Sequence, residues 1–335
     1  LEAAWKFIFL SSVGIAFALL GIIFLHYAAS LVAPETLETL DWATLKRIAP
    51  ELSPALARLA FIFILIGYGT KTGLAPMHTW LPDAHSQAPT PVSALLSGAL
   101  LNTALYAILR LAQLLAPAAG EGYVPQLLQL FGLLSVAVAT PFILVQQDLK
   151  RLLAYSSIEH MGLITFGLGL ASDLGRYGAL FHILNHSLAK ALMFFAAGLL
   201  VQHYGSRQLL KLRGAASSLP PLGFILAAGT LALIGLPPFG LFSSEFLMIR
   251  AALASGQVFQ AGALLFLLLC IFAGFIYALG VLSQRRERSE AAPHPRLPRL
   301  ALATTALVLV PLLVLGVYVP QPLNSLLSKI AALLG

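Results

Sequence analysis

Two histidines and a lysine at intervals of four residues form the clearest chemical pattern in this sequence of 335 residues. His182, His186 and Lys190 would share one face of a helix, because residues four apart are neighbours on a helix surface. Three such groups cover roughly 12 Å along the helix axis. Histidine titrates near neutral pH, so a ladder of groups that each bind and release a proton is typical of a proton relay. A structural polar seam and haem ligation are the alternatives.

A second pair of ionisable residues stands in the apolar segment before this ladder. Glu159 and His160 follow two serines and precede Met161. They either extend the relay or pair with each other. We place His160 in the candidate relay.

Two apolar segments are interrupted by proline and glycine, and each interruption has an ionisable residue beside it. Lys71 precedes the break at residues 73–76, and Glu245 follows the break at residues 235–240. Proline and glycine remove helical hydrogen bonds and loosen a helix. A charge within a membrane span costs about 2.5–3.5 kcal/mol on insertion scales and marks a candidate functional residue. For Lys71 the alternative is snorkelling to a nearby interface.

Membrane-spanning helices must position these residues. Hydrophobic residues make up 59% of the chain and charged residues 10%, whereas a soluble domain carries about 25% charged residues. This composition excludes an ordinary cytosolic enzyme, a disordered tail and a nucleic-acid binder. The single cysteine, Cys270, excludes a disulfide framework, a thiolate zinc site and iron–sulfur ligation within the chain.

The long apolar runs lack the alternation of a β-barrel, and a helix needs about 20 apolar residues to cross a bilayer. We therefore predict an all-α polytopic helical bundle that forms a single transmembrane domain over residues 1–335. The predicted spans are nine, at about 5–30, 55–75, 90–116, 124–147, 152–171, 174–203, 221–250, 257–282 and 299–320.

The two interrupted spans are the second and the seventh, so they run in opposite directions through the membrane. Broken helices at corresponding places in two oppositely oriented halves are typical of a transporter with inverted repeats. The alternative is two unrelated proline kinks.

The distribution of lysine and arginine predicts the orientation. Of 20 such residues, eleven lie on the side of the N-terminus and seven on the opposite side, while Lys71 and Lys190 lie inside spans. Five of the eleven fall in the loop 285–299. The N-terminus is therefore predicted to be cytoplasmic, in a bacterial-type inner membrane. The first apolar stretch lacks a basic leader and a cleavage site, so we interpret it as a true span of a chain truncated upstream of Leu1.

The polar segment at residues 77–86 carries a family resemblance. It reads Met-His-Thr-Trp-Leu-Pro-Asp-Ala-His-Ser, and it either lines a water-filled access path or caps two helices. With Gly-Thr-Lys at residues 69–71 and Gln-Ala-Pro-Thr at residues 87–90, it resembles the signature of the antiporter-like, proton-conducting membrane subunits. That family includes the L, M and N chains of respiratory complex I, the Mrp cation/proton antiporters and the membrane arms of energy-converting hydrogenases.

The resemblance covers nearly the whole chain. It continues through residues 148–157, the helix of His182, His186 and Lys190, and residues 242–246. The His-Thr-Trp at residues 78–80, together with residues 91–98, is most similar to the hydrogenase-4 component F type.

The resemblance implies roles for individual residues. The nine spans would be similar to the sixth through fourteenth helices of a fourteen-helix subunit, and would form its C-terminal two-thirds. Lys71 would match the central lysine of the first broken helix, and Glu245 the terminal lysine-or-glutamate position of the second. Asn102 stands where relatives often carry lysine or histidine, so the link from Lys71 must use water or another group. The glutamate partner of the central lysine would lie upstream of Leu1.

Residues and resemblance together predict a proton-translocating membrane subunit of a respiratory-type oxidoreductase complex. Lys71 would store and release a proton, the histidines and Lys190 would relay it, and Glu245 would pass it to the exit side or to a neighbouring subunit. The chain has no Walker A loop, no dinucleotide-binding glycine motif and no thiolate cluster.

We therefore expect no cofactor or metal in this chain. Its partners would be the other membrane and peripheral subunits of a hydrogenase-like or NADH dehydrogenase-like complex. The alternatives are an Mrp-type cation/proton antiporter, which moves sodium, and a haem- or quinone-binding redox subunit.

Overall fold

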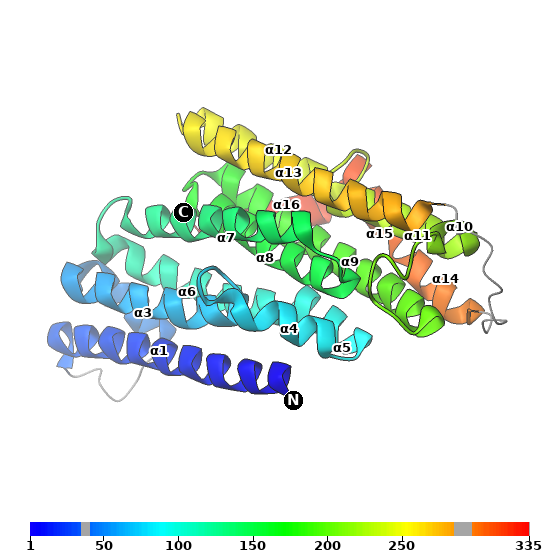
Figure 1. The fold of residues 1–335 in the computed structure, drawn as a ribbon. Coiled ribbons are helices and arrows are strands. Elements are labelled where there is room, and N and C mark those ends of the chain that lie inside the picture. Colours follow the sequence, from blue (N-terminus) through cyan, green and yellow to red (C-terminus); the bar gives the residue numbers. More distant parts are fainter. Residues whose placement is uncertain (35–40, 285–296, 335) are drawn as a thin grey trace.

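The structure is a computed structural model that describes residues 1–34, 41–284 and 297–334. Within these ranges the regular elements are helices, and no strand is present. The helices run side by side in an elongated bundle (Figure 1). Seven helices or helix groups are long and apolar enough to cross a bilayer. The predicted all-α polytopic fold is therefore confirmed, and the chain is a multi-pass membrane protein.

The N-terminal part of the bundle pairs α1 with α3 and α3 with α6. Figure 1 shows α1 and α3 along one side of the bundle. The helices of this part are α1 (Glu2–Val32), α2 (Trp42–Ile48), α3 (Pro54–Thr72), α4 (Trp80–Gln87), α5 (Thr90–Leu95) and α6 (Leu101–Ala119).

The remaining helices surround α8 and α9. Figure 1 shows α12 and α13 on the side opposite α1. The helices are α7 (Tyr123–Val145), α8 (Leu149–Gly169), α9 (Asp173–Tyr204), α10 (Ala215–Ser218), α11 (Pro220–Leu233), α12 (Gly240–Ala254), α13 (Val258–Ser283), α14 (Arg299–Leu307), α15 (Leu309–Val317) and α16 (Gln321–Leu333).

Helix α8 forms the core of the bundle. All of its residues from Leu152 to its end are buried. Small residues allow this close packing: a Cβ atom on Gly132 of α7 would lie 2.4 Å from the backbone nitrogen of Phe166 on α8. Glycine lets helix backbones approach closely inside a membrane. Because neighbouring helices shield α8 from lipid, it can hold polar side chains at membrane depth.

Both predicted helix breaks are present. Helix α3 ends at Thr72, where Gly73 takes the left-handed conformation with φ 82°. The chain then turns through Met77–Thr79 into α4. Helix α11 ends at Leu233, and α12 begins at Gly240. The first break places buried non-helical backbone at residues 73–75, and the second places half-buried backbone at residues 234–236, followed by the exposed Pro237 and Pro238. Protein or water must satisfy such backbone at membrane depth.

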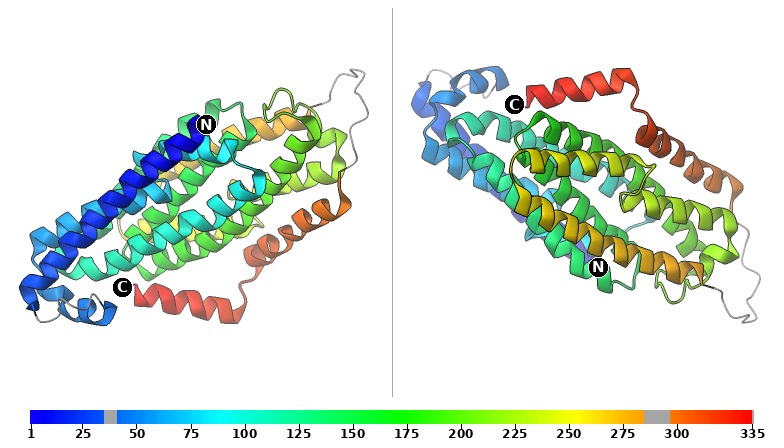
Figure 2. Two further views of the ribbon diagram at one scale, coloured as in Figure 1. Left: turned by 90° about the horizontal axis from the view of Figure 1, so that it is seen from below. Right: turned by 90° about the horizontal axis from the view of Figure 1, so that it is seen from above.

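Three features differ from the predicted spans. The span 90–116 contains a π-helical turn, Leu96–Leu100, and the span 299–320 is divided into α14 and α15. Helices α14, α15 and α16 run along one edge of the bundle (Figure 2). Helices α2 and α16 were not predicted, because each is too short to give an apolar span.

The count of nine spans stays a prediction. Helix α8 is absent from the seven candidates because its polar side chains lower its hydropathy, and α11 has only 14 residues. Four of the arginines used to predict the orientation, Arg285, Arg286, Arg288 and Arg296, lie outside the described residues.

Candidate functional site

The histidine–lysine ladder lies at the centre of the bundle. His182, His186 and Lys190 are each 0% exposed. The helix that carries them, α9, packs against α8, α12, α5, α11 and α16. The ladder therefore faces protein and is isolated from lipid.

Lys190 is anchored to the first turns of α8. Its Nζ donates to the carbonyl oxygen of Leu153 over 2.9 Å and to Oγ of Ser156. The Ser156 hydroxyl lies 3.0 Å from the same carbonyl oxygen and can donate to it. Among the described residues no carboxylate lies within ion-pair distance of Lys190, although Glu159 interacts with it electrostatically. The direct hydrogen-bond partners of the amine are therefore neutral oxygens.

His160 of α8 joins the two histidines of α9. Its Nδ1 lies 3.0 Å from Nε2 of His182, which is a direct hydrogen bond between imidazoles. Its ring centre lies 5.1 Å from that of His186. Neither ring nitrogen of His186 has a hydrogen-bond partner among the described residues. A buried polar atom needs a partner, so a bridging water is expected beside His186.

Lys190, His186, His160 and His182 form a buried row of titratable side chains. The second helix break brings a carboxylate to the far end of this row. Ligand-capable atoms of His160, His182 and Glu245 all lie within 4.8 Å of one another. Nδ1 of His182 also lies 2.8 Å from Oγ of Ser244. At these separations a proton can pass directly or through a single water.

Gly235 makes room for the Glu245 carboxylate. A Cβ atom at this position would lie 2.1 Å from Glu245 Oε2, and Gly235 has φ 64°. Both the close approach and the left-handed conformation favour glycine. The break therefore shapes the pocket that holds Glu245.

Glu159 lies beside the row. It is 2% exposed, and its Oε2 lies 3.4 Å from Nε2 of His160. Glu159 and His160 were expected either to extend the relay or to pair with each other. His160 contacts both Glu159 and the α9 histidines, so the geometry is compatible with both.

Lys71 is not brought into the row. Its side chain is half-buried, and its Nζ lies 5.2 Å from the ring centre of Phe7 on α1. It lines a groove of about 420 Å³ between α1, α3 and α6. Within residues 1–34, 41–284 and 297–334 it forms no ion pair with a carboxylate.

Asn102 connects the side of the bundle near Lys71 to α9. Its Nδ2 donates to Ser187 Oγ over 3.0 Å and to the Gly98 carbonyl oxygen over 2.9 Å. That carbonyl belongs to the π-helical turn and also accepts from the Ser187 hydroxyl over 2.7 Å. The sequence analysis expected water or another group to link Lys71 to the second half of the bundle. The amide of Asn102 and the hydroxyl of Ser187 form a hydrogen-bonded pair next to His186.

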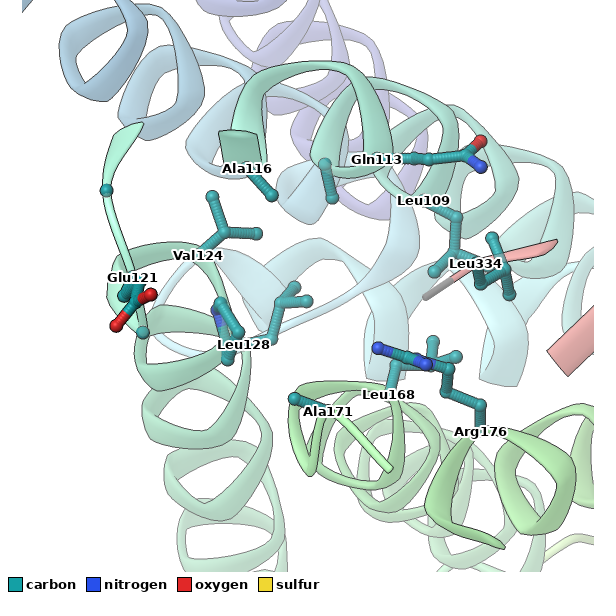
Figure 3. Close-up of a pocket in the computed structure, with 14 residues that line it drawn as sticks. Leu109, Gln113, Ala116, Glu121, Val124, Leu128, Leu168, Ala171, Arg176 and Leu334 are labelled. Carbon is teal, nitrogen blue, oxygen red and sulfur yellow. The ribbon is translucent and has the colours of Figure 1, made fainter. Parts of the chain in front are cut away.

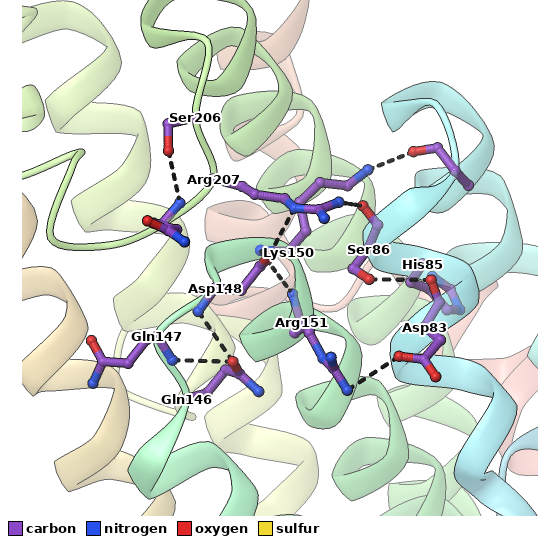
Figure 4. A network of polar contacts seen from close by, with 12 residues as sticks. Asp83, His85, Ser86, Gln146, Gln147, Asp148, Lys150, Arg151, Ser206 and Arg207 are labelled. Carbon is purple, nitrogen blue, oxygen red and sulfur yellow. Dashed lines mark hydrogen bonds and ion pairs between the residues drawn. The ribbon is translucent and has the colours of Figure 1, made fainter. Parts of the chain in front are cut away.

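A polar network covers the end of the bundle that holds the N-terminus (Figure 4). Asp83 pairs with Lys6 and Arg151 over 2.9 and 3.2 Å, and Asp148 pairs with Arg207 over 2.8 Å. Lys150 Nζ donates to the Ala88 carbonyl oxygen over 2.6 Å. These contacts tie the end of α4 to the start of α8.

A cavity of about 250 Å³ lies at the opposite end of the bundle (Figure 3). Glu121, Gln113 and Arg176 give it polar groups among mainly apolar walls. Arg176 precedes His182 by six residues on α9, which is roughly 9 Å along the axis. The polar row thus lies between a charged network at one end and this cavity at the other.

Sequence reasoning did not select two serines that belong to the row. Ser156 accepts from Lys190, and Ser244 contacts His182. Each belongs to a pair of serines that precedes an acidic residue, Ser156 and Ser157 before Glu159 and Ser243 and Ser244 before Glu245. Helical spacing alone could not choose between the members of each serine pair, because their contacts are made to other helices.

Comparison with known proteins identifies relatives along most of the chain. Residues 1–274 match the family described as NADH:quinone oxidoreductase/Mrp antiporter, transmembrane. A hydrogenase-4 component F homolog of Methylacidiphilum infernorum (isolate V4) is 45% identical over 84% of this chain and 58% of its own length. NADH-quinone oxidoreductase subunit N of Desulforudis audaxviator (strain MP104C) is 34% identical over 94% of this chain and 63% of its own length.

A solved structure shares the fold. A chain of the archaeal membrane-bound sulfane sulfur reductase, a respiratory membrane complex, superposes with a TM-score of 0.87 at 28% identity. The match covers 99% of this chain and 66% of that one. The chain thus spans about two thirds or less of the length of these relatives.

Proposed function

Because the chain belongs to the NADH:quinone oxidoreductase/Mrp antiporter transmembrane family, we propose that it moves protons within a larger membrane-bound oxidoreductase complex. The observation that carries the proposal is the buried row of Lys190, His186, His160, His182 and Glu245. These groups come from α8, α9 and the second helix break, and each can bind and release a proton.

The direct bond between His160 and His182 gives the row a means of proton transfer. One of the two nitrogens donates and the other accepts, according to the tautomer of each ring. When a proton reaches the outer nitrogen of one ring, the opposite nitrogen of that ring releases its own. Protons therefore advance by one group at a time while each imidazole returns to the neutral state.

Ser244 and Glu245 receive the proton at the end of the row. The Ser244 hydroxyl lies within hydrogen-bond distance of His182 Nδ1 and of the Leu241 carbonyl oxygen, 2.8 Å in each case. It can therefore turn between them. Glu245 accepts the proton at the helix break and passes it to the exit side or to a neighbouring subunit.

Lys71 serves the same process at the first helix break, where we propose that it stores and releases a proton. The Asn102–Ser187 contact supports a connection from that half of the bundle to α9. We also propose that the acidic partner of Lys71 lies on a preceding helix. The chain would then correspond to the C-terminal two-thirds of a fourteen-helix subunit.

The geometry favours the relay over haem ligation. Nδ1 of His160 and Nε2 of His182 lie only 3.0 Å apart, so these two nitrogens are too close together to be the opposite axial ligands of one haem iron. Electron-carrying groups then belong to partner subunits of a hydrogenase-like or NADH dehydrogenase-like complex. We propose a bacterial-type inner membrane location with the N-terminus on the cytoplasmic side.

A comparison of two substitutions on α9 tests this function. In the full-length subunit within its complex, His186→Ala should lower proton pumping per turnover about 100-fold, because it lengthens a transfer step beyond reach. Met193→Ala, a buried apolar control on the same helix, should leave that ratio unchanged. Pumping is measured by a pH-sensitive dye in sodium-free membrane vesicles and divided by the electron-transfer rate of the same vesicles.

Two outcomes would contradict the proposal. If both variants lose the same fraction of proton pumping per turnover, the row has a structural role and not a proton-transfer role. Pumping that requires sodium in the unmodified complex would support the cation/proton antiporter instead.

A further inference from the structure

His85, near the end of α4, is a buried imidazole that the row described above does not include. It is 0% exposed, and neither of its ring nitrogens has a hydrogen-bond partner among the described residues. Burying a polar group without a partner is costly, so such groups in folded proteins normally meet water or another polar atom. The surroundings of His85 show where that partner must come from.

Aromatic rings flank the His85 imidazole. Its centre lies 6.4 Å from the Trp80 ring and 5.6 Å from the Phe194 ring, and both planes are within 28° of parallel. Trp80 is itself fixed by an Nε1–H bond to the Thr70 carbonyl oxygen over 2.7 Å. The stack covers the faces of His85, and the Ser93 backbone also approaches the ring, so a water that serves its nitrogens must be enclosed together with them.

One side of His85 faces the buried row. Phe194 lies one helical turn after Lys190 on α9, and residues four apart lie on the same helix face. His85 interacts electrostatically with both Lys190 and His186. His85 therefore lies against the face of α9 that carries Lys190 and His186.

The other side of His85 faces the charged network at the end of the bundle. Figure 4 shows it next to Ser86, whose carbonyl oxygen accepts from Arg207 over 2.5 Å. Lys150 also interacts electrostatically with His85, and its Nζ binds the Ala88 carbonyl oxygen. His85 is thus one residue from a network that reaches the surface through Arg207 and Asp148.

We propose that His85 is the proton uptake group of this chain, which joins the charged network to Lys190 and His186. The proposal rests on the proposed function of the buried row. A proton from a water on the network side binds one ring nitrogen. The other nitrogen then releases its proton, through a water, to the neutral amine of Lys190 or to an unpaired nitrogen of His186. The imidazole ends neutral in its other tautomer, and rotation of the ring restores the first.

Three substitutions test the proposal in the assembled complex. His85→Phe keeps an aromatic ring in the stack but removes both nitrogens, and it should lower proton pumping per turnover at least tenfold. His85→Gln keeps hydrogen bonding without titration and should show a similar loss. Met193→Ala, a buried apolar change on α9 outside the stack, should pump within about twofold of the unmodified complex. The readout is dye-detected pumping divided by electron-transfer rate, with assembly measured on native gels.

The outcomes separate this proposal from the one on which it rests. Normal pumping by His85→Phe or by His85→Gln would overturn it, as would an equal loss in Met193→Ala. His186→Ala is measured in parallel. If His186→Ala fails and His85→Phe pumps normally, only the uptake role is wrong, whereas normal pumping by both variants contradicts the row itself.

Discussion

Replacement of Glu245 by glutamine should reduce proton pumping about 100-fold or more while the complex still assembles. Glutamine keeps the shape and the hydrogen-bonding capacity of the side chain but cannot bind and release a proton. Because Glu245 stands within 4.8 Å of ligand-capable atoms of His160 and His182, its loss removes the last group of the row. A positioned proton donor or acceptor contributes about 10²–10⁴-fold to a proton-transfer rate.

Other substitutions at this position make the test specific. Glu245→Asp should retain part of the activity, because the carboxylate remains but its reach shortens. Glu245→Lys should also retain some, because the residue can still titrate. Glu51→Gln, at an exposed carboxylate, provides the matched control and should pump normally. If Glu245→Gln pumps like this control, Glu245 only supports the helix break and the exit group lies elsewhere.

A second large loss is expected for His160→Phe. His160 contacts both His182, through a 3.0 Å hydrogen bond, and His186, with ring centres 5.1 Å apart. Phenylalanine can fill the space of the imidazole but carries no proton, so the row is divided into two parts. Pumping should fall about 100-fold or more.

The neighbouring residue gives a control for packing. Met161 is also 0% exposed on α8, and Met161→Leu conserves its volume, a change that usually costs less than about 1.5 kcal/mol. This variant should pump at the unmodified rate per assembled complex. Pumping by His160→Phe at the same rate would show that protons pass by another route.

The spacing of residues in the sequence predicted the His182–His186–Lys190 ladder but not its contact with His160. His182, His186 and Lys190 lie on one helix, so their alignment follows from the helical repeat. The contact of His160 with them depends on how α8 packs against α9, and that packing depends on close approaches such as Gly132 against Phe166. Such tertiary distances leave no periodic signal in one sequence.

For the two helix breaks, the sequence likewise predicted their positions but not the directions of the side chains beside them. Proline and glycine placed both breaks correctly, and each has its ionisable residue beside it. Glu245 turns toward the histidines because Gly235 leaves space for its carboxylate. Lys71 instead faces the groove between α1, α3 and α6, and the direction of a side chain from a broken helix depends on the helices that surround it.

The sequence around His85 allowed two interpretations. The segment at residues 77–86 was expected either to line an access path or to cap two helices. Its polar and proline residues did not predict the helix α4, and the full burial of His85 beside Trp80 and Phe194 is visible only in the folded chain. Sequence therefore located the polar segment, whereas the depth of each side chain required the fold.

Infrared difference spectroscopy of the complex during turnover tests the central claim most directly, because it detects protonation of individual groups. We expect a carboxyl band that disappears in Glu245→Gln and imidazole bands that shift when histidine is isotopically labelled and disappear in His160→Phe. Both should change in step with proton pumping. The account would be contradicted if the complex pumped protons at its normal rate while the Glu245 carboxyl and the buried imidazoles showed no change in protonation.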